Sequence, residues 1–172
     1  MKVNRTFPIT FKRTALLALA LAALALAPSV TQAGDQVPFR AIWDAQIEIT
    51  PLSPPLVAVS GSGEGRATHL GRMTAQSIAE VVNLATGEGA ASYRFTAANG
   101  DEVLVNFVFT AIPISATAFS IQGVWQVTGG TGRFDGAFGS GTYEGQVEFT
   151  GPASALGQFE LEGTISSPGS LK

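Results

Sequence analysis

The clearest structural signal in this chain is a glycine-rich segment at residues 127–141, which reads VTGGTGRFDGAFGSG. Glycine reaches positive φ without steric cost, so glycines at this density indicate a tight, convoluted connection rather than a flexible linker. The segment lies between two runs in which apolar and polar residues alternate, a pattern typical of β-strands with one buried face. It is therefore predicted to connect two strands of an antiparallel sheet.

The same alternation recurs along the chain about every fifteen residues, between glycine, proline and Asn-Gly turn signals. Two segments alternate less clearly, residues 57–70 with an interruption near residues 61–65, and residues 72–82. No stretch has a helical period, so the sequence predicts an all-β domain of about eight strands. The clearest apolar faces belong to the last two strands and comprise Tyr143, Val147, Phe149, Phe159, Leu161 and Ile165.

Antiparallel strands with one apolar face each can close into a barrel or fold into a two-sheet sandwich. We favour a single eight-stranded antiparallel β-barrel, because closure removes the exposed strand edges and such a barrel either fills with side chains or holds one small ligand. An outer-membrane barrel would also show alternation, but here the aromatics form no two girdles and the polar faces carry glutamates. The aromatic residues expected to point inward are Trp43, Tyr93, Phe107, Phe109, Trp125, Tyr143, Phe149 and Phe159.

Residues 1–33 have the pattern of a secretory signal peptide. Four basic residues precede an apolar run at residues 15–27, which is shorter than the roughly 20 residues that a membrane-spanning helix needs. Thr31 and Ala33 supply small residues at the cleavage positions. We therefore expect residues 34–172 to form one exported domain, periplasmic or secreted, with no stable membrane anchor after cleavage.

The expected domain is acidic. Four of the ten basic residues lie in the leader, so six remain against all thirteen carboxylates and the net charge is −7. A surface of this sign repels phosphate backbones, and nucleic acid is not expected as a partner. The chain contains no cysteine, which excludes disulfide bonds and thiolate metal sites. The oligomeric state does not follow from the sequence.

Residues 127–141 resemble the GGTG-x-F-x-x-A-x-G turn of the dirigent and allene oxide cyclase-like barrels, a calycin-like fold. Residues 61–72, which read GSGEGRATHLGR, and residues 159–166 are similar to segments of exported bacterial proteins grouped with that barrel. The resemblance implies an eight-stranded antiparallel barrel in which the turn residues are structural. These are Gly129, Gly130, Gly132, Phe134, Gly136 and Gly139.

Members of that superfamily cyclise an unsaturated fatty-acid epoxide, guide radical coupling or cyclise polyketides, all without a cofactor. The resemblance accordingly implies no cofactor for this chain. The matching turn is scaffold rather than catalytic machinery, so no catalytic residue is carried over and the catalytic residues are left unassigned.

The candidate ligand-binding residues are inward aromatics and the only histidine. His69 could transfer protons near neutral pH, and its neighbours Arg66 and Arg72 could form a small cationic mouth for a carboxylate ligand. A buried phenol needs a hydrogen-bond partner, so a tyrosine could either orient a ligand or bond within the core. The candidates are Trp43, His69, Tyr93, Phe107, Trp125 and Tyr143.

Carboxylates on the polar faces of the first and last two strands would form one acidic stripe if the last strand pairs with the first. Rows of this kind without clustered loop ligands are usually hydrated, and no metal site is assigned to them. They are Asp44, Glu48, Glu144, Glu148, Glu160 and Glu162.

Three function classes remain open from the sequence. The barrel could bind a small hydrophobic molecule in its lumen, act as a cofactor-independent cyclase or isomerase of allene oxide cyclase or dirigent type, or serve as a structural or interaction protein with a filled core. Room inside the barrel and convergent polar groups would favour the first two, and complete aromatic filling the third. A pair of titratable groups with perturbed pKa values inside would distinguish an enzyme from a binder.

Overall fold

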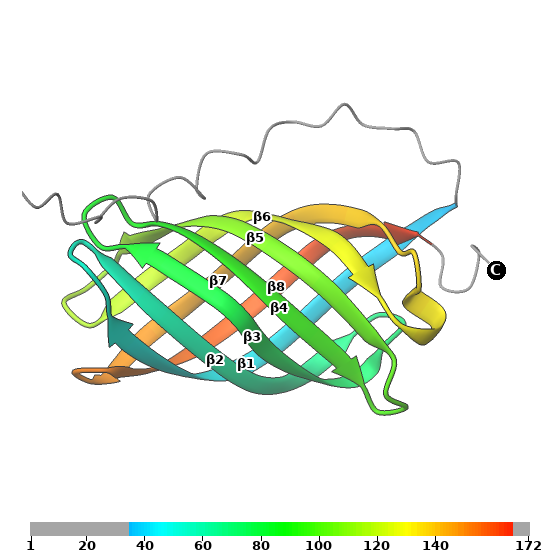
Figure 1. Ribbon diagram of the computed structural model, residues 1–172, viewed down its shortest axis with the longest axis horizontal. Helices are drawn as coiled ribbons and strands as arrows, with labels where there is room; N and C mark the ends of the chain where they lie inside the picture. The colour runs from blue at the N-terminus through cyan, green and yellow to red at the C-terminus, as the bar shows by residue number, and fades with distance from the viewer. Residues whose placement is uncertain (1–34, 167–172) are drawn as a thin grey trace, which may run out of the picture. The chain divides into compact units, whose positions relative to one another are not determined.

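Eight long strands and one short 3₁₀ helix make up the computed structural model, which describes residues 35–166 (Figure 1). The predicted signal peptide, residues 1–33, lies outside the described residues. The elements are β1 (Gln36–Pro51), β2 (Leu56–Ala67), β3 (Gly71–Asn83), β4 (Glu88–Ala97), β5 (Glu102–Pro113), β6 (Ala118–Gly130), η1 (Gly132–Phe134), β7 (Gly139–Gly151) and β8 (Ser154–Ser166).

Each strand pairs antiparallel with the next along the chain, and β8 pairs with β1 to close the barrel. The closing register aligns Trp43 with Phe159 and Gln36 with Ser166. The predicted eight-stranded antiparallel barrel is confirmed, and the sandwich alternative is excluded. The expected interruption of the second strand was wrong, because β2 runs unbroken through its glycines, with Gly63 opposite Ala45 and Gly65 opposite Trp43.

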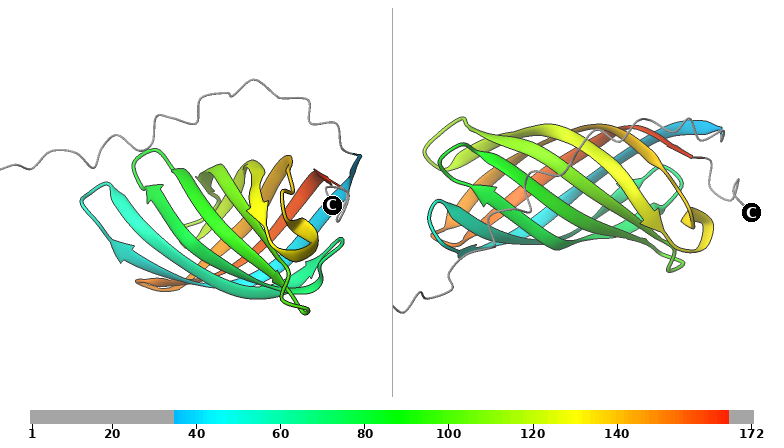
Figure 2. Two further views of the ribbon diagram at one scale, coloured as in Figure 1. Left: turned by 45° about the vertical axis from the view of Figure 1, so that its right-hand side comes forward. Right: turned by 45° about the horizontal axis from the view of Figure 1, so that its top comes forward.

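The barrel has two different ends. The distal end, on the left in Figure 1, carries the β1–β2, β3–β4, β5–β6 and β7–β8 turns. The proximal end carries the β2–β3 and β4–β5 turns, η1 and both ends of the described chain. Figure 2 shows η1, the β4–β5 turn and the start of β1 together at this proximal end.

The glycine-rich connection between β6 and β7 packs against the proximal end. The backbone N–H of Thr131 donates to the carbonyl of Glu102 (2.9 Å), and the N–H of Glu102 donates to Thr131 Oγ1 (3.0 Å). Gly132 adopts φ +59°, which favours glycine, and Phe134 is fully buried. The connection therefore covers the core at this end. Of the other predicted turn residues, Gly129 and Gly130 end β6, Gly136 lies in the following turn and Gly139 begins β7.

Burial of the inward side chains differs between the two ends. Near the proximal end, Phe39, Val103, Phe134 and Ile165 are each at most 1% exposed. Near the distal end, Val57 and Ala155 are also buried, but seven inward apolar side chains are only partly buried. They are Ile49, Val59, Val82, Ala111, Phe119, Val147 and Phe149.

Candidate functional site

A β-bulge in β3 changes which residues point into the barrel. Ser77 pairs with Tyr93, but Ala79 pairs with Ser92, so one extra residue, Ile78, is inserted in β3. Side chains alternate faces along a strand, and one inserted residue shifts that alternation by one. The odd-numbered Met73 is buried before the bulge, and the even-numbered Glu80 faces inward after it.

Glu80 and Tyr93 form a hydrogen-bonded pair inside the barrel. The Tyr93 hydroxyl donates to Glu80 Oε2 at 2.9 Å. Tyr93 is 5% exposed, whereas Glu80 keeps partial exposure. The phenol lies over Gly61 of β2, where a Cβ would stand 2.6 Å from its oxygen, so glycine at this position makes room for the hydroxyl.

Burial controls the protonation of this pair. It raises the pKa of Glu80 to about 7, although the hydrogen bond from Tyr93 favours the carboxylate and partly opposes the rise. Burial, followed by the neighbouring carboxylate, raises the pKa of Tyr93 well above its ordinary value. Burial likewise raises the pKa of Tyr143, with smaller contributions from Tyr93 and Glu80. The site therefore combines one carboxyl group that titrates near neutral pH with two phenols that stay neutral.

Four of the six predicted ligand-binding residues form one aromatic cluster in the middle of the barrel. The rings of Trp43 and Tyr143 stack with centroids 6.1 Å apart and planes inclined by 7°. The ring centroid of Phe107 lies 4.6 Å from that of Tyr143 and 5.6 Å from that of Tyr93. The rings pack against one another, so aromatic side chains fill much of the interior at this level. The indole Nε1 of Trp43 is buried and has no hydrogen-bond partner among residues 35–166.

The other two predicted residues lie elsewhere. The Trp125 ring contacts Phe39 at 5.5 Å, and its Nε1 donates to the carbonyl oxygen of Glu162 at 3.2 Å. His69 is exposed in the β2–β3 turn at the proximal end, with φ +68°. Arg66 and Arg72 face each other on the outer surface beside it. The structure does not bring these residues to Glu80.

Glu80 was not among the sequence-based candidates. Counting alternate residues from Met73 and Ala75 places residue 80 on the outer face, where a glutamate is unremarkable. The available signal was the loss of alternation along residues 72–82, ending in the adjacent apolar pair Val81 and Val82. A bulge in this segment is one way to reconcile the pattern with a continuous strand.

Polar grooves cross the outer face of the barrel away from this pair. One runs between two cross-strand rows of outward side chains on β2, β1, β8, β7 and β6. The β8–β1 register places Asp44 opposite Gln158 and Glu48 opposite Ser154, so the expected acidic stripe is interrupted. Arg40 forms ion pairs with Glu160 and Glu162. Within residues 35–166, no group of three or more acidic or histidine side chains is placed to hold a metal ion. Two rows of side chains border the groove described first. One row comprises Arg66, Ile42, Glu160, Glu144 and Gln122, and the other comprises Glu64, Asp44, Gln158, Gln146 and Ser120.

The chain is thus a closed antiparallel barrel with a carboxyl–phenol pair inside. Among solved structures it is similar to the pterocarpan synthase dirigent protein GePTS1, with a TM-score of 0.44 and 13% sequence identity over 82% of this chain and 95% of that one. No family model and no curated protein matches the chain. No helix in the described part of the chain is both long and apolar enough to cross a membrane.

Proposed function

We propose that this protein is an exported small β-barrel that binds a small, largely apolar molecule at its distal end, with Glu80 and Tyr93 contacting the polar group of that molecule. The observation that carries the proposal is the inward hydrogen bond between the Tyr93 hydroxyl and Glu80 Oε2 (2.9 Å). Glu80 lies on β3, two residues before Val82, which is one of the partly buried distal side chains. Small-molecule sites typically combine an apolar lining with a few convergent polar groups.

In this proposal, two regions of the barrel contact different parts of the bound molecule. The distal apolar side chains, among them Phe119 and Phe149 whose rings lie 5.7 Å apart, would contact the apolar body of the molecule. The carboxyl and phenol would fix its orientation, and the unpartnered indole N–H of Trp43 is a further donor inside the barrel. Export is supported by the leader pattern of residues 1–33, and it would place binding in the periplasm or outside the cell.

The direct test has two parts. Native mass spectrometry of the protein purified from its own source should reveal a co-purifying hydrophobic molecule. The neutral fluorophore N-phenyl-naphthylamine should bind the emptied protein saturably at one site, and widening of that site by Phe119→Ala should weaken binding. Glu148→Ala, on the outer face of β7, is the matched control and should leave binding unchanged. No saturable binding and no co-purifying molecule would instead favour a structural protein with a filled core.

A cofactor-independent isomerase or cyclase is the second candidate, favoured by one specific observation. Burial raises the pKa of Glu80 to about 7 beside a neutral phenol, and a carboxyl group of this kind can give or take a proton near neutral pH. In that case the co-purified molecule should change chemically with time, and the rate should depend on pH with a midpoint near 7. Glu80→Gln should abolish the conversion while binding persists.

A further inference from the structure

We propose that the molecule bound at the distal end is an organic cation, an ammonium group attached to an apolar body, with the ammonium paired to Glu80. This inference rests on the binding function proposed above and specifies the chemical class of the ligand. It follows from three features of the described residues: the charge balance of the interior, the aromatic cluster that contains the phenol partner of Glu80, and the acidity of the outer surface.

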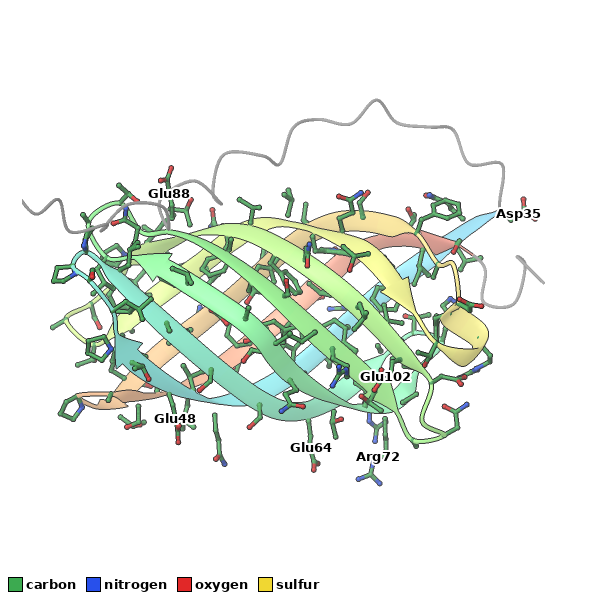
Figure 3. All side chains as sticks on the ribbon, viewed as in Figure 1. Asp35, Glu48, Glu64, Arg72, Glu88 and Glu102 are labelled. Carbon is green, nitrogen blue, oxygen red and sulfur yellow. The ribbon has the colours of Figure 1, made fainter. Side chains whose placement is uncertain are left out.

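The interior holds a carboxyl group without a basic partner. Within residues 35–166, the ion pairs of Arg40, Arg94 and Arg133 are formed with acidic residues other than Glu80. The remaining basic groups, Arg66, Arg72 and His69, are exposed, and Figure 3 shows Arg72 pointing away from the barrel. A buried carboxylate is costly unless it is paired. An ammonium group would supply that pairing, whereas an anionic ligand would be repelled.

The phenol that bonds to the carboxyl group belongs to the aromatic cluster of the core. Tyr93 donates directly to Glu80, and its ring lies 6.4 Å from that of Trp43 and 5.6 Å from that of Phe107. Ring faces attract cations through their quadrupoles, and tryptophan does so most strongly. A carboxylate combined with aromatic rings is therefore chemically suited to an ammonium ion, and the partly exposed distal side chains are suited to its apolar body.

The outer surface would favour cations during approach. Residues 35–166 contain thirteen acidic residues and five arginines. Figure 3 shows Glu48, Glu64 and Glu88 pointing away from the barrel, into solvent. A negative surface potential raises the local concentration of positively charged ligands and lowers that of anions.

Protonation gives the inference a distinct pH signature. Burial raises the pKa of Glu80 to about 7, and an ammonium group should bind its charged form. The other titratable groups that face Glu80 are Tyr93 from β4 and Tyr143 from β7, and burial raises the pKa of both, so they stay neutral from pH 6 to pH 8. Affinity for a permanent cation should therefore increase with pH across this range.

The test uses probes that share a naphthylmethyl body and differ in charge: the primary ammonium, the trimethylammonium, the neutral alcohol, and naphthoate as the anion. Calorimetric titrations would use the full chain, expressed with its leader and purified. At pH 8 the ammonium probes should bind about tenfold or more tightly than the alcohol, and naphthoate should not bind measurably. The trimethylammonium probe, whose charge does not vary, should gain about tenfold in affinity from pH 6 to pH 8.

Glu80→Gln should remove both the preference for the ammonium and the pH dependence. Glu148→Gln on the outer face is the matched control and should behave as the wild type. The inference is overturned, and the binding function retained, if the alcohol binds as tightly as the cations, which would point instead to a neutral ligand satisfying the Trp43 donor. Failure of all four probes to bind would overturn the inference together with the proposed function. The pH dependence of the unaltered protein decides the matter even if Glu80→Gln does not fold.

Discussion

Replacing Glu80 with glutamine should change how stability depends on pH. Burial raises the pKa of Glu80 from 4.5 to about 7, so the folded chain holds this proton more tightly than the unfolded chain does. The stabilisation from this proton is fully present below the unfolded value and is lost as the pH rises through about 7. One pKa unit corresponds to about 1.4 kcal/mol, so the wild type should lose about 3 kcal/mol through this group between pH 4.5 and pH 8.

The measurement is urea unfolding of both proteins at the two pH values. Because glutamine does not ionise, the stability of Glu80→Gln relative to the wild type should rise by about 3 kcal/mol from pH 4.5 to pH 8. Arg133 and Arg40 lower the pKa values of Asp101 and Glu160, but those groups titrate in both proteins and cancel in the difference. For the control Glu148→Gln, the stability difference from the wild type should be the same at both pH values. A change of less than about 0.5 kcal/mol for Glu80→Gln would refute the inward, desolvated placement of this carboxyl group.

Three further substitutions test the core, the glycine-rich connection and the carboxyl–phenol pair. Phe107→Ala should cost about 3–5 kcal/mol in chemical unfolding, whereas Glu148→Ala should be nearly silent, and similar small effects at both would mean that the inward and outward faces are misassigned. Gly132→Val should lower stability by roughly 1–3 kcal/mol because φ is +59° and a Cβ would collide with the Asp101 carboxylate; an unchanged melting temperature would contradict this. Tyr93→Phe removes the hydrogen bond that favours the charged carboxylate, so the pKa of Glu80, followed by carbon NMR of the carboxyl group, should move further up rather than down.

Regular alternation made most of the barrel predictable. In β8, Phe159 and Leu161 are buried while the intervening Glu160 carries its charge outside, in agreement with the period of two read from the sequence. The Asn-Gly turn signal was equally informative, because Asn99 and Gly100 lie in the turn between β4 and β5, where Gly100 adopts φ +87°. Closure of β8 onto β1 followed from the need to protect strand edges rather than from any local motif.

The aromatic cluster was only partly predictable, because inward direction can be read from alternation but ring contacts cannot. Trp43 and Trp125 both point inward, yet Trp43 packs in the middle of the barrel and Trp125 turns to Phe39 and a backbone carbonyl. Which ring meets which depends on the shear of the barrel and on rotamers, and neither is set by the sequence of a single strand. His69 was chosen as a candidate only because an imidazole can transfer protons near neutral pH. In the structure it lies exposed in the β2–β3 turn, with φ +68°.

The bulge in β3 explains both the missed residue and its chemistry. Without the extra residue, odd-numbered residues would continue to point inward after Ser77, and Glu80 would lie on the outer face with the other glutamates. The insertion leaves Ile78 54% exposed and disturbs the pairing of β3 with β2 as well as with β4. Ser77 compensates locally, because its Oγ accepts the backbone N–H of Gly61 at 2.8 Å.

An exposed isoleucine and a broken ladder are local costs, and such departures from regular structure occur preferentially where a side chain must be redirected. Here the redirected side chain is the carboxyl group of Glu80. Gly61 donates its backbone N–H to Ser77 at the bulge, and its lack of a side chain also leaves room for the Tyr93 hydroxyl. Bulge, glycine, carboxyl group and phenol therefore depend on one another. The insertion that breaks the alternation of β3 is therefore also what turns Glu80 inward and gives the barrel interior its ionisable carboxyl group.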